Sequence, residues 1–183
     1  MLGSYDLLVV PLTVDHRPAT HSDLEAIASI YDHEVRTGTA TFDTEPRSPA
    51  EWQAWFDAHQ SPSYPVIVAC SSGRIFGWAS LSAWSERGAY SRTVEASVFV
   101  DREHRNRHVG ADLLRELIDS ARSPGHRVVL GRIETGNEMS RKLLISAGFT
   151  SVGTMHRVGE KFGRLLDVEL FEFVLSSGSP PGR

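Results

Sequence analysis

The segment from residue 93 to residue 133 constrains the fold most strongly, because its hydrophobic period changes twice. Residues 93–100 read TVEASVFV, a run of β-branched and aromatic residues that predicts a strand. A helical stripe follows, and Pro124-Gly125 ends it; its members are Val109, Leu113, Leu114, Leu117, Ile118 and Ala121. Residues 127–133 again predict a strand. This order predicts two parallel strands joined by a right-handed crossover.

Further helices and strands surround this unit. Ser22 with Glu25, and Ser48 with Glu51, form the capping-box pattern at which a helix begins. A short helix opens at Asn137 and ends at Gly148 as a left-handed cap. The other expected strands cover residues 14–17, 66–70, 75–81, about 150–158 and 165–174. The order predicts a mixed α/β sheet of about six to seven strands, flanked by about four helices on both faces.

The chain has 183 residues and 40% hydrophobic content, which suits a single domain that we expect to span residues 14–174. Residues 1–13 are expected to be an N-terminal extension, and the Pro- and Gly-rich residues 175–183 a disordered tail. A net charge of −4 argues against nucleic-acid binding, and no run approaches the roughly 20 apolar residues that span a bilayer. The single cysteine, Cys70, excludes an internal disulfide and favours a reducing compartment, the cytoplasm.

Positive charge gathers where the helix after residue 100 begins. Arg102, Arg105 and Arg107 lie in the loop just before that helix. The first amides of a helix lack intrahelical partners, and the helix dipole places partial positive charge there. Backbone N–H groups from about Asn106 to Ala111 therefore predict a site for a diphosphate.

The same loop carries a resemblance to a known family. Residues 99–111, FVDREHRNRHVGA, resemble the acetyl-CoA loop of the GNAT superfamily of N-acetyltransferases, whose pattern is Arg/Gln-x-x-Gly-x-Gly/Ala. Arg105 and Gly110 fit the ends of that pattern, and His108 stands where the family has glycine. Residues 41–52, 87–100, 137–149 and 159–167 are similar to segments of the phosphinothricin N-acetyltransferase branch. The resemblance covers residues 14–174 in order and spacing.

The resemblance implies a GNAT fold that uses acetyl-CoA as co-substrate and assembles as a homodimer. It implies that the strands at 93–100 and 127–133 splay apart, so that amides of the first strand bind the pantetheine arm. The cofactor-binding residues that it implies are Val98, Phe99, Val100, Arg105, Asn106, Arg107, His108, Val109, Gly110, Ala111, Asn137 and Ser140.

Glu95 interrupts the apolar strand at 93–100. A carboxylate there must be hydrated or paired, so it either faces water from an exposed side of the sheet or takes part in a reaction. The resemblance places the catalytic glutamate of the branch at this position. An ammonium has no free lone pair to attack a thioester, so Glu95 is expected to take its proton, directly or through a water. A backbone N–H near Phe99 is expected to polarise the carbonyl.

Two positions depart from the family pattern. Leu144 stands where members carry a tyrosine or histidine that protonates the leaving thiolate. A thiol pKa near 8.5 makes unassisted departure feasible, and Tyr90 and His156 are the other candidate donors. If the backbone at His108 has a positive φ, histidine costs about 1 kcal/mol more than glycine. We expect weakened cofactor binding there, with a ring that fills the pocket as the alternative.

The acceptor side is predicted from the resemblance and from charge. Arg87 and Tyr90 belong to the segment that resembles the substrate loop, and a guanidinium suits a carboxylate or phosphinate because its fork matches two oxygens. The resemblance implies that Phe42 lines the same pocket, and that the hairpin around Lys161 reaches the active site, across a dimer interface as one option. The implied acceptor is a small free amino acid or analogue, such as phosphinothricin, methionine sulfone or methionine sulfoximine.

Two other functions remain open at this point. An acyl-CoA-binding or sensing protein without turnover would fit Leu144 and His108, whereas Glu95 argues against it. A protein or peptide N-acetyltransferase would need an open groove, whereas residues 36–50 and 84–92 resemble walls that close a pocket. No metal is expected, because His104 and His108 have no third ligand at a useful spacing.

Overall fold

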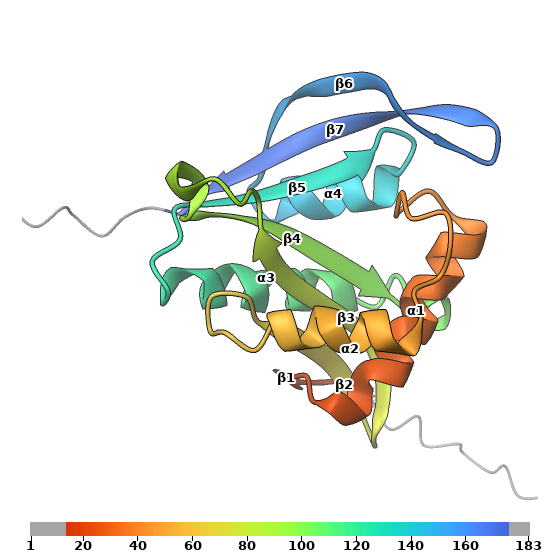
Figure 1. The fold of residues 1–183 in the computed structure, drawn as a ribbon, viewed down its shortest axis with the longest axis vertical. Helices are drawn as coiled ribbons and strands as arrows, with labels where there is room; N and C mark the ends of the chain where they lie inside the picture. The colour runs from red at the N-terminus through yellow and green to blue at the C-terminus, as the bar shows by residue number, and fades with distance from the viewer. Residues whose placement is uncertain (1–13, 176–183) are drawn as a thin grey trace, which may run out of the picture.

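The computed structural model describes residues 14–175 and contains one seven-stranded mixed sheet, in the order β1-β2-β3-β4-β5-β7-β6 (Figure 1). β4 and β5 run parallel, and the other neighbouring pairs run antiparallel. The strands are β1 (Asp15–Pro18), β2 (Val66–Ser71), β3 (Arg74–Ala83), β4 (Thr93–Val100), β5 (Val128–Glu134), β6 (Thr150–Lys161) and β7 (Arg164–Val174). The predicted strand content and the predicted parallel pair are confirmed.

Within residues 14–175, four α-helices cover the two faces of the sheet (Figure 1). They are α1 (Leu24–Thr37), α2 (Pro49–Ala58), α3 (Val109–Arg122) and α4 (Glu138–Ser146). One face packs against α3 and α4, and the other packs against α1 and α2. The arrangement agrees with the predicted single α/β domain. No helix among residues 14–175 has the length and apolar character needed to cross a membrane.

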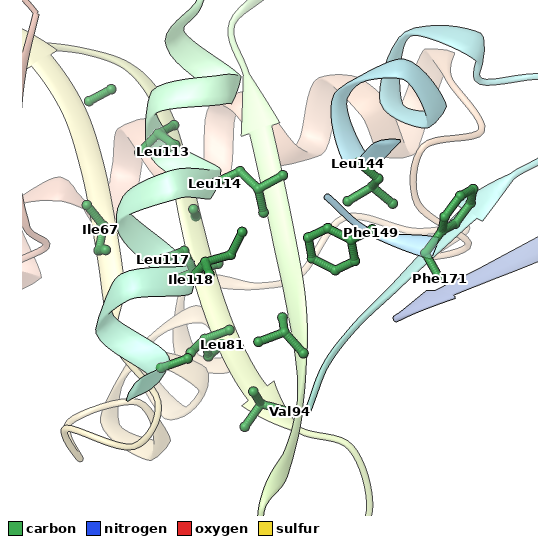
Figure 2. Close-up of a cluster of buried hydrophobic side chains, with 14 of the residues drawn as sticks. Ile67, Leu81, Val94, Leu113, Leu114, Leu117, Ile118, Leu144, Phe149 and Phe171 are labelled. Carbon is green, nitrogen blue, oxygen red and sulfur yellow. The ribbon is translucent and has the colours of Figure 1, made fainter. Parts of the chain in front are cut away.

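The apolar stripe of α3 builds the larger core cluster. Leu113, Leu114 and Leu117 are fully buried against β2, β3 and β4 (Figure 2). Burial of a leucine side chain stabilises a fold by about 1.5–3 kcal/mol, so this stripe anchors the crossover helix to the sheet. Across the sheet, an aromatic cluster that includes Trp52 and Trp78 anchors α1 and α2.

The start of α1 differs from the prediction. Ser22 does not cap the helix; instead the backbone N–H of Thr20 donates to the Asp23 carboxylate at 2.8 Å, and α1 begins at Leu24. Arg17 donates to the same carboxylate at 2.6 and 2.8 Å, which fixes Asp23 at this position. The second predicted capping box is confirmed, because Ser48 and Glu51 bond each other's backbone N–H.

Smaller differences concern element ends. β3 and β6 are longer than predicted, since pairing with β4 and β7 continues through polar residues that carry no apolar signal. Gly148 has a φ of +94°, which confirms the left-handed cap. Leu175, the first residue after the expected domain, is buried, and its N–H donates to the Arg127 carbonyl at 2.8 Å. The predicted extension at 1–13 and the remaining tail lie outside the described residues.

Candidate active site

The parallel ladder between β4 and β5 is short. It pairs Thr93 with Val128, Val94 with Val129 and Glu95 with Leu130, and the two strands then diverge (Figure 1). A cleft of 640 Å³ opens where they part, with β4 residues 95–99 on one wall and β5 residues 131–134 on the other. The splay expected from the sequence is therefore present.

Backbone direction along β4 decides which amides face this cleft. Thr93 accepts from the Trp84 N–H and Asp101 donates to Phe76, so the backbone groups of odd-numbered residues point to β3. Because backbone groups alternate along a strand, those of Val98 and Val100 point toward β5, into the splay. The N–H of Phe99 points to β3, so the amide near Phe99 that can reach a ligand belongs to Val98 or Val100.

The N-terminus of α3 lies at one end of the splay. His108 caps the helix with a φ of +64°, and the first helical bond runs from the Asp112 N–H to the His108 carbonyl at 3.0 Å. The amides of Val109, Gly110 and Ala111 therefore precede the helical ladder and suit an anion. The His108 side chain is exposed and does not line the cleft, which contradicts the alternative of a ring that fills the pocket.

Gly110 keeps the space in front of these amides open. A Cβ built at this residue would lie 3.4 Å from Val100 Cγ2 and 3.6 Å from Leu143 Cδ2. A side chain here would thus fill the gap between β4 and α4. Both distances are ordinary van der Waals contacts, and the φ of Gly110 lies in the ordinary range, so the glycine contributes open space and no special backbone conformation.

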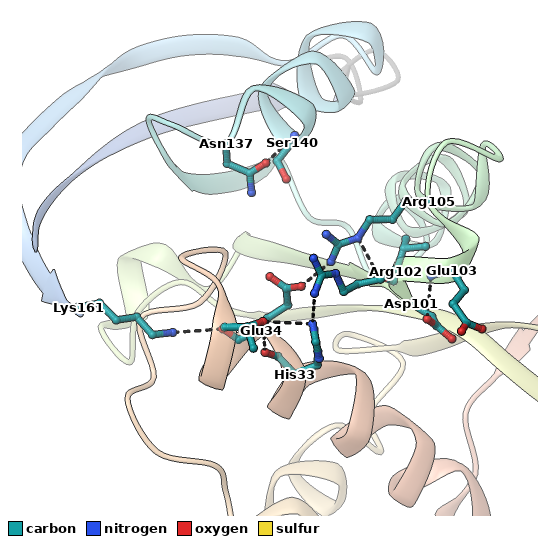
Figure 3. A network of polar contacts seen from close by, with 11 residues as sticks. His33, Glu34, Asp101, Arg102, Glu103, Arg105, Asn137, Ser140 and Lys161 are labelled. Atoms are coloured by element: carbon teal, nitrogen blue, oxygen red, sulfur yellow. Dashed lines mark hydrogen bonds and ion pairs between the residues drawn. The ribbon is translucent and has the colours of Figure 1, made fainter.

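Two arginines of the loop, Arg102 and Arg105, are bonded within the protein (Figure 3). Arg105 donates to the buried Glu34 at 2.5 Å and to the Val100 carbonyl at 3.2 Å. Arg102 donates to His33 at 2.9 Å. Arg105 therefore ties α1 to the end of β4, while its remaining N–H groups and Arg107 supply positive charge near the amides.

α4 forms the opposite wall of the cleft. Asn137 caps the helix by accepting from the Ser140 N–H at 3.1 Å, and both residues line the cleft (Figure 3). Leu144 is buried and lies so close to β5 that a Cβ on Gly131 would be 3.0 Å from its Cδ1. The side chain at this position is apolar and cannot donate a proton.

Glu95 is bonded to a residue that the sequence did not indicate. Arg132 donates from Nε and Nη2 to the two carboxylate oxygens of Glu95 at 2.6 and 2.7 Å. The guanidinium lies 5.4 Å from the ring of Trp84. Both Glu95 and Arg132 line the cleft. An arginine at the exposed end of a strand has no distinctive sequence signal, because the splay that brings it to Glu95 is a tertiary feature.

Aromatic side chains line the other end of the cleft. Tyr31, Trp55, Trp78 and Phe99 come from α1, α2, β3 and β4, and Phe42 adds an exposed ring from the loop before α2. The Phe42 ring rests on Gly159, where any Cβ would collide with it. This end suits a small organic molecule with an apolar side chain.

Arg47 is the cation at this aromatic end. Its guanidinium lies 5.2 Å from the Tyr31 ring and 5.1 Å from the Trp52 ring, and 3.2 Å from the Asp43 carboxylate. Tyr31 donates to Asp43 at 2.8 Å, and burial raises the pKa of Tyr31 to about 12. The phenol therefore stays neutral and holds Asp43, which orients Arg47. The sequence analysis missed Arg47 because a loop arginine is usually solvated.

The other predicted substrate residues do not line the cleft. Arg87 and Tyr90 are exposed in the loop before β4. Lys161 is buried and donates to the carbonyls of Glu34 and Thr41 at 3.3 and 2.8 Å (Figure 3). Desolvation lowers the pKa of Lys161. Its ammonium fastens the β6–β7 hairpin to the loop before α2, so the predicted contacts of these three residues with an acceptor find no support in the geometry.

Neither alternative proton donor reaches the cleft. Tyr90 is exposed, and the exposed His156 bonds Asp167 at 2.9 Å on β7. Asp101, Glu103 and His104 form a cluster with metal-ligand atoms within 4.8 Å of one another. Arg74 pairs with both carboxylates of that cluster, at 3.3 Å from Asp101 and 2.9 Å from Glu103.

The chain resembles known proteins along most of its length. The Acetyltransferase (GNAT) family model matches residues 27–149. The L-methionine sulfoximine/L-methionine sulfone acetyltransferase of Pseudomonas paraeruginosa is 39% identical over 160 residues, which cover 87% of this chain and 93% of that protein. The phosphinothricin N-acetyltransferase of Streptomyces viridochromogenes is 34% identical over 168 residues, which cover 92% and 91% of the two chains.

The fold is also similar to solved structures. An acetyltransferase from Salmonella typhimurium, solved with its cofactor acetyl-CoA, matches with a TM-score of 0.87 and 36% identity. The match covers 92% of this chain and 98% of that chain. These comparisons confirm the fold that the resemblance implied.

Proposed function

Since the chain belongs to the acetyltransferase (GNAT) family, whose members use acetyl-CoA, we propose that it acetylates the amino group of a small amino-acid-like acceptor. One observation carries the proposal: the ladder between β4 and β5 stops at Glu95, and beyond it opens a cleft with an aromatic end. The N-terminus of α3 lies next to this opening, because Gly110 packs beside Val98 and Val100 of β4. The relatives named for methionine sulfoximine, methionine sulfone and phosphinothricin indicate the acceptor class.

The cofactor fits the residues of the cleft. The amides of Val109, Gly110 and Ala111 suit the diphosphate, and the absent side chain at Gly110 leaves it room. The amides of Val98 and Val100 suit the pantetheine arm, which would extend the sheet between the splayed strands. Asn137 and Ser140 would contact the arm from α4.

Glu95 takes the proton of the incoming ammonium in this proposal. Arg132 fixes the direction of the carboxylate through two charge-assisted hydrogen bonds. Leu144 offers no proton to the departing thiolate, which leaves unassisted because thiols have a pKa near 8.5.

Arg47 is the proposed partner of the acceptor's acidic group. The guanidinium keeps free N–H groups while bonded to Asp43, and it lies over aromatic rings at the end of the cleft distant from α3. A carboxylate held there would direct the amine of an amino acid toward Glu95, and Phe42 would cover the side chain. Enclosure by the loop that holds Arg47 favours a free amino acid over a peptide.

Two measurements test the proposal. Acetyl-CoA at tenfold excess over its dissociation constant should stabilise the protein by about 1.4 kcal/mol in a thermal melt. Thiol release should then appear with phosphinothricin, methionine sulfone or another amino acid in a substrate panel. Glu95→Gln should lower turnover strongly and leave the cofactor-induced stabilisation intact.

The outcomes separate the two candidate functions. Stabilisation by acetyl-CoA without thiol release for any amine would favour an acyl-CoA-binding protein, for which the apolar Leu144 is the supporting observation. No stabilisation at millimolar acetyl-CoA would reject both.

A homodimer in the cytoplasm completes the proposal. The β6–β7 hairpin exposes apolar side chains, namely Val152, Met155, Val158, Phe162 and Leu165, and a second copy of the chain could cover them. The unpaired Cys70 supports a reducing compartment. Sedimentation velocity should show a dimer that Phe162→Asp weakens, and a wild-type monomer at high concentration would contradict the assembly.

A further inference from the structure

We propose that Ser82 and His59 form a second proton acceptor in the cleft, which works beside Glu95. This inference rests on the proposed acetyl transfer and deepens it. Ser82 lies on β3 directly opposite Glu95 on β4 in the antiparallel register. Side chains of directly opposed residues share one face with Cβ atoms about 4.5–5.5 Å apart. Both residues line the cleft, so one amine can reach both side chains.

His59 is held behind Ser82 by two hydrogen bonds. It follows the last residue of α2, and its Nε2 lies 3.0 Å from Ser82 Oγ. Its Nδ1 lies 2.6 Å from the Trp55 carbonyl oxygen, and its ring packs against Trp55 at a tilt of 38° with the centroids 4.4 Å apart. The ring orientation is therefore fixed by the end of α2.

These contacts decide the tautomer of His59. A carbonyl oxygen only accepts, so Nδ1 must carry the hydrogen. In the neutral ring Nε2 is then an acceptor, and the Ser82 hydroxyl donates to it. The Ser82 oxygen keeps its lone pairs for a proton from the cleft. The relay is thus oriented from the cleft through Ser82 to His59.

The ring is neutral near pH 7. Burial lowers the pKa of His59, and the positive charge of Arg47 acts in the same direction. The other charged groups near the relay are Glu95, which lies opposite Ser82, and Arg132, which pairs with Glu95. A neutral imidazole is a stronger base than a carboxylate, so it can accept the second proton of the acceptor nitrogen, which Glu95 does not take.

The chemistry requires two proton acceptors. An ammonium that becomes an amide loses two protons, and one carboxylate takes one of them. Glu95 takes the first, and the freed lone pair forms the N–C bond to the acetyl carbonyl carbon. The second proton passes from the nitrogen to Ser82 Oγ while the Ser82 proton moves to His59 Nε2. The C–S bond breaks, the thiolate leaves with the electron pair, and His59 releases its proton to solvent.

Substitutions at Ser82 and His59 test the relay. Ser82→Ala should lower kcat about tenfold to a hundredfold, with the KM for acetyl-CoA unchanged within about twofold. Ser82→Thr keeps the hydroxyl and should restore most of the rate. His59→Gln should lower kcat by the same factor as Ser82→Ala, and the double variant should add no further loss. His126→Gln removes a buried histidine outside the cleft, and it should leave kcat near the wild-type value.

The pH dependence of kcat and the tautomer of His59 are two further readouts, and a purely structural role of Ser82 would not affect them. The wild-type kcat should fall as His59 becomes protonated at acidic pH. The part of this fall that is due to His59 should be absent from the pH profile of Ser82→Ala. Nitrogen chemical shifts should show His59 as the Nδ1–H tautomer. An active wild type with an unaffected Ser82→Ala variant, or with the Nε2–H tautomer, would overturn the relay alone. A wild type that releases no thiol with any amine would overturn the proposed function first.

Discussion

Arg132 shows how one residue can set the chemistry of a site without a sequence signal. Its guanidinium bonds both oxygens of Glu95 and lies 5.4 Å from the ring of Trp84. We expect Arg132→Met to lower kcat about tenfold, because the freed carboxylate loses its fixed direction. The cofactor-induced stabilisation should stay at the wild-type value, since Arg132 does not contact the N-terminus of α3. An unchanged kcat would show that Glu95 needs no such partner.

His108 has a left-handed backbone conformation, with a φ of +64°. A glycine there removes a strain of about 1 kcal/mol, so His108→Gly should raise the free energy of unfolding by about 0.5–1 kcal/mol in urea titrations. The same change at His33, inside α1, should lower it by about 1 kcal/mol. Equal effects at the two positions would contradict the assignment of strain to His108.

The sequence predicts site residues well where a local sequence pattern identifies them. It predicts them poorly where only contacts between distant elements bring them into the site. The loop pattern at residues 99–111 identified Gly110, and the start of the helix at Asn137 identified that residue as its cap. The structure places both residues beside the gap between β4 and β5. Arg47, Arg132 and the Ser82–His59 pair belong to different elements that meet only in the folded sheet. Arg87 was favoured for its charge, yet the short helical turn at Gly88–Tyr90 leaves it exposed.

At the scale of elements, the start of α1 depends on a charge pair. Arg17 donates two hydrogen bonds to Asp23, and this contact lowers the pKa of Asp23 to about 2. Since the folded pKa lies below the unfolded value near 3.9, the pair stabilises the fold above about pH 4 and loses this effect as the pH falls toward 2.

Asp23→Asn measures this contribution. The substitution should lower the free energy of unfolding at pH 7 by about 1–2 kcal/mol, because Arg17 is partly exposed and water screens the pair. Urea titrations at several pH values should show the difference between wild type and variant shrink below pH 4. A difference that stays constant down to pH 2 would contradict the assigned cause.

The junction of β4, α3 and α4 depends on the space at Gly110. Gly110→Val should abolish the stabilisation by acetyl-CoA, because the side chain would lie between Val100 and Leu143, where the diphosphate is proposed to bind. The unliganded melting temperature should stay near the wild-type value, since the new contacts are apolar and not overpacked. A wild-type cofactor effect in this variant would place the diphosphate elsewhere.

Hydrophobic period predicts the elements of this fold because most of them bury one face. The α3 stripe and the strands on either side of it are local patterns, and together they predict the parallel pair. The sequence predicts β6 only to about residue 158, whereas the strand runs to Lys161, because its side chains are largely exposed and its pairing with β7 shifts register at two places. An element that buries little apolar surface has only a weak hydrophobic pattern in the sequence, so its ends are hard to predict.

At the scale of the whole molecule, the central sheet supports the fold and also forms the cleft between β4 and β5. β4 bonds β3 along its full length, but it bonds β5 only from Thr93 to Glu95, so the sheet is closed at one end and open at the other. The two core clusters cover opposite faces of the sheet, with α3 and α4 on one face and α1 and α2 on the other. The cleft is therefore a product of the topology, and substitutions within it need not unfold the protein.

A crystal structure of the complex with acetyl-CoA tests this account most directly. We expect the pantetheine arm between β4 and β5, bonded to the amides of Val98 and Val100, with the diphosphate at the amides of Val109 to Ala111. The acetyl carbon should lie beside Glu95 and Ser82. An unoccupied splay, with acetyl-CoA absent or bound to another surface of the protein, would contradict it.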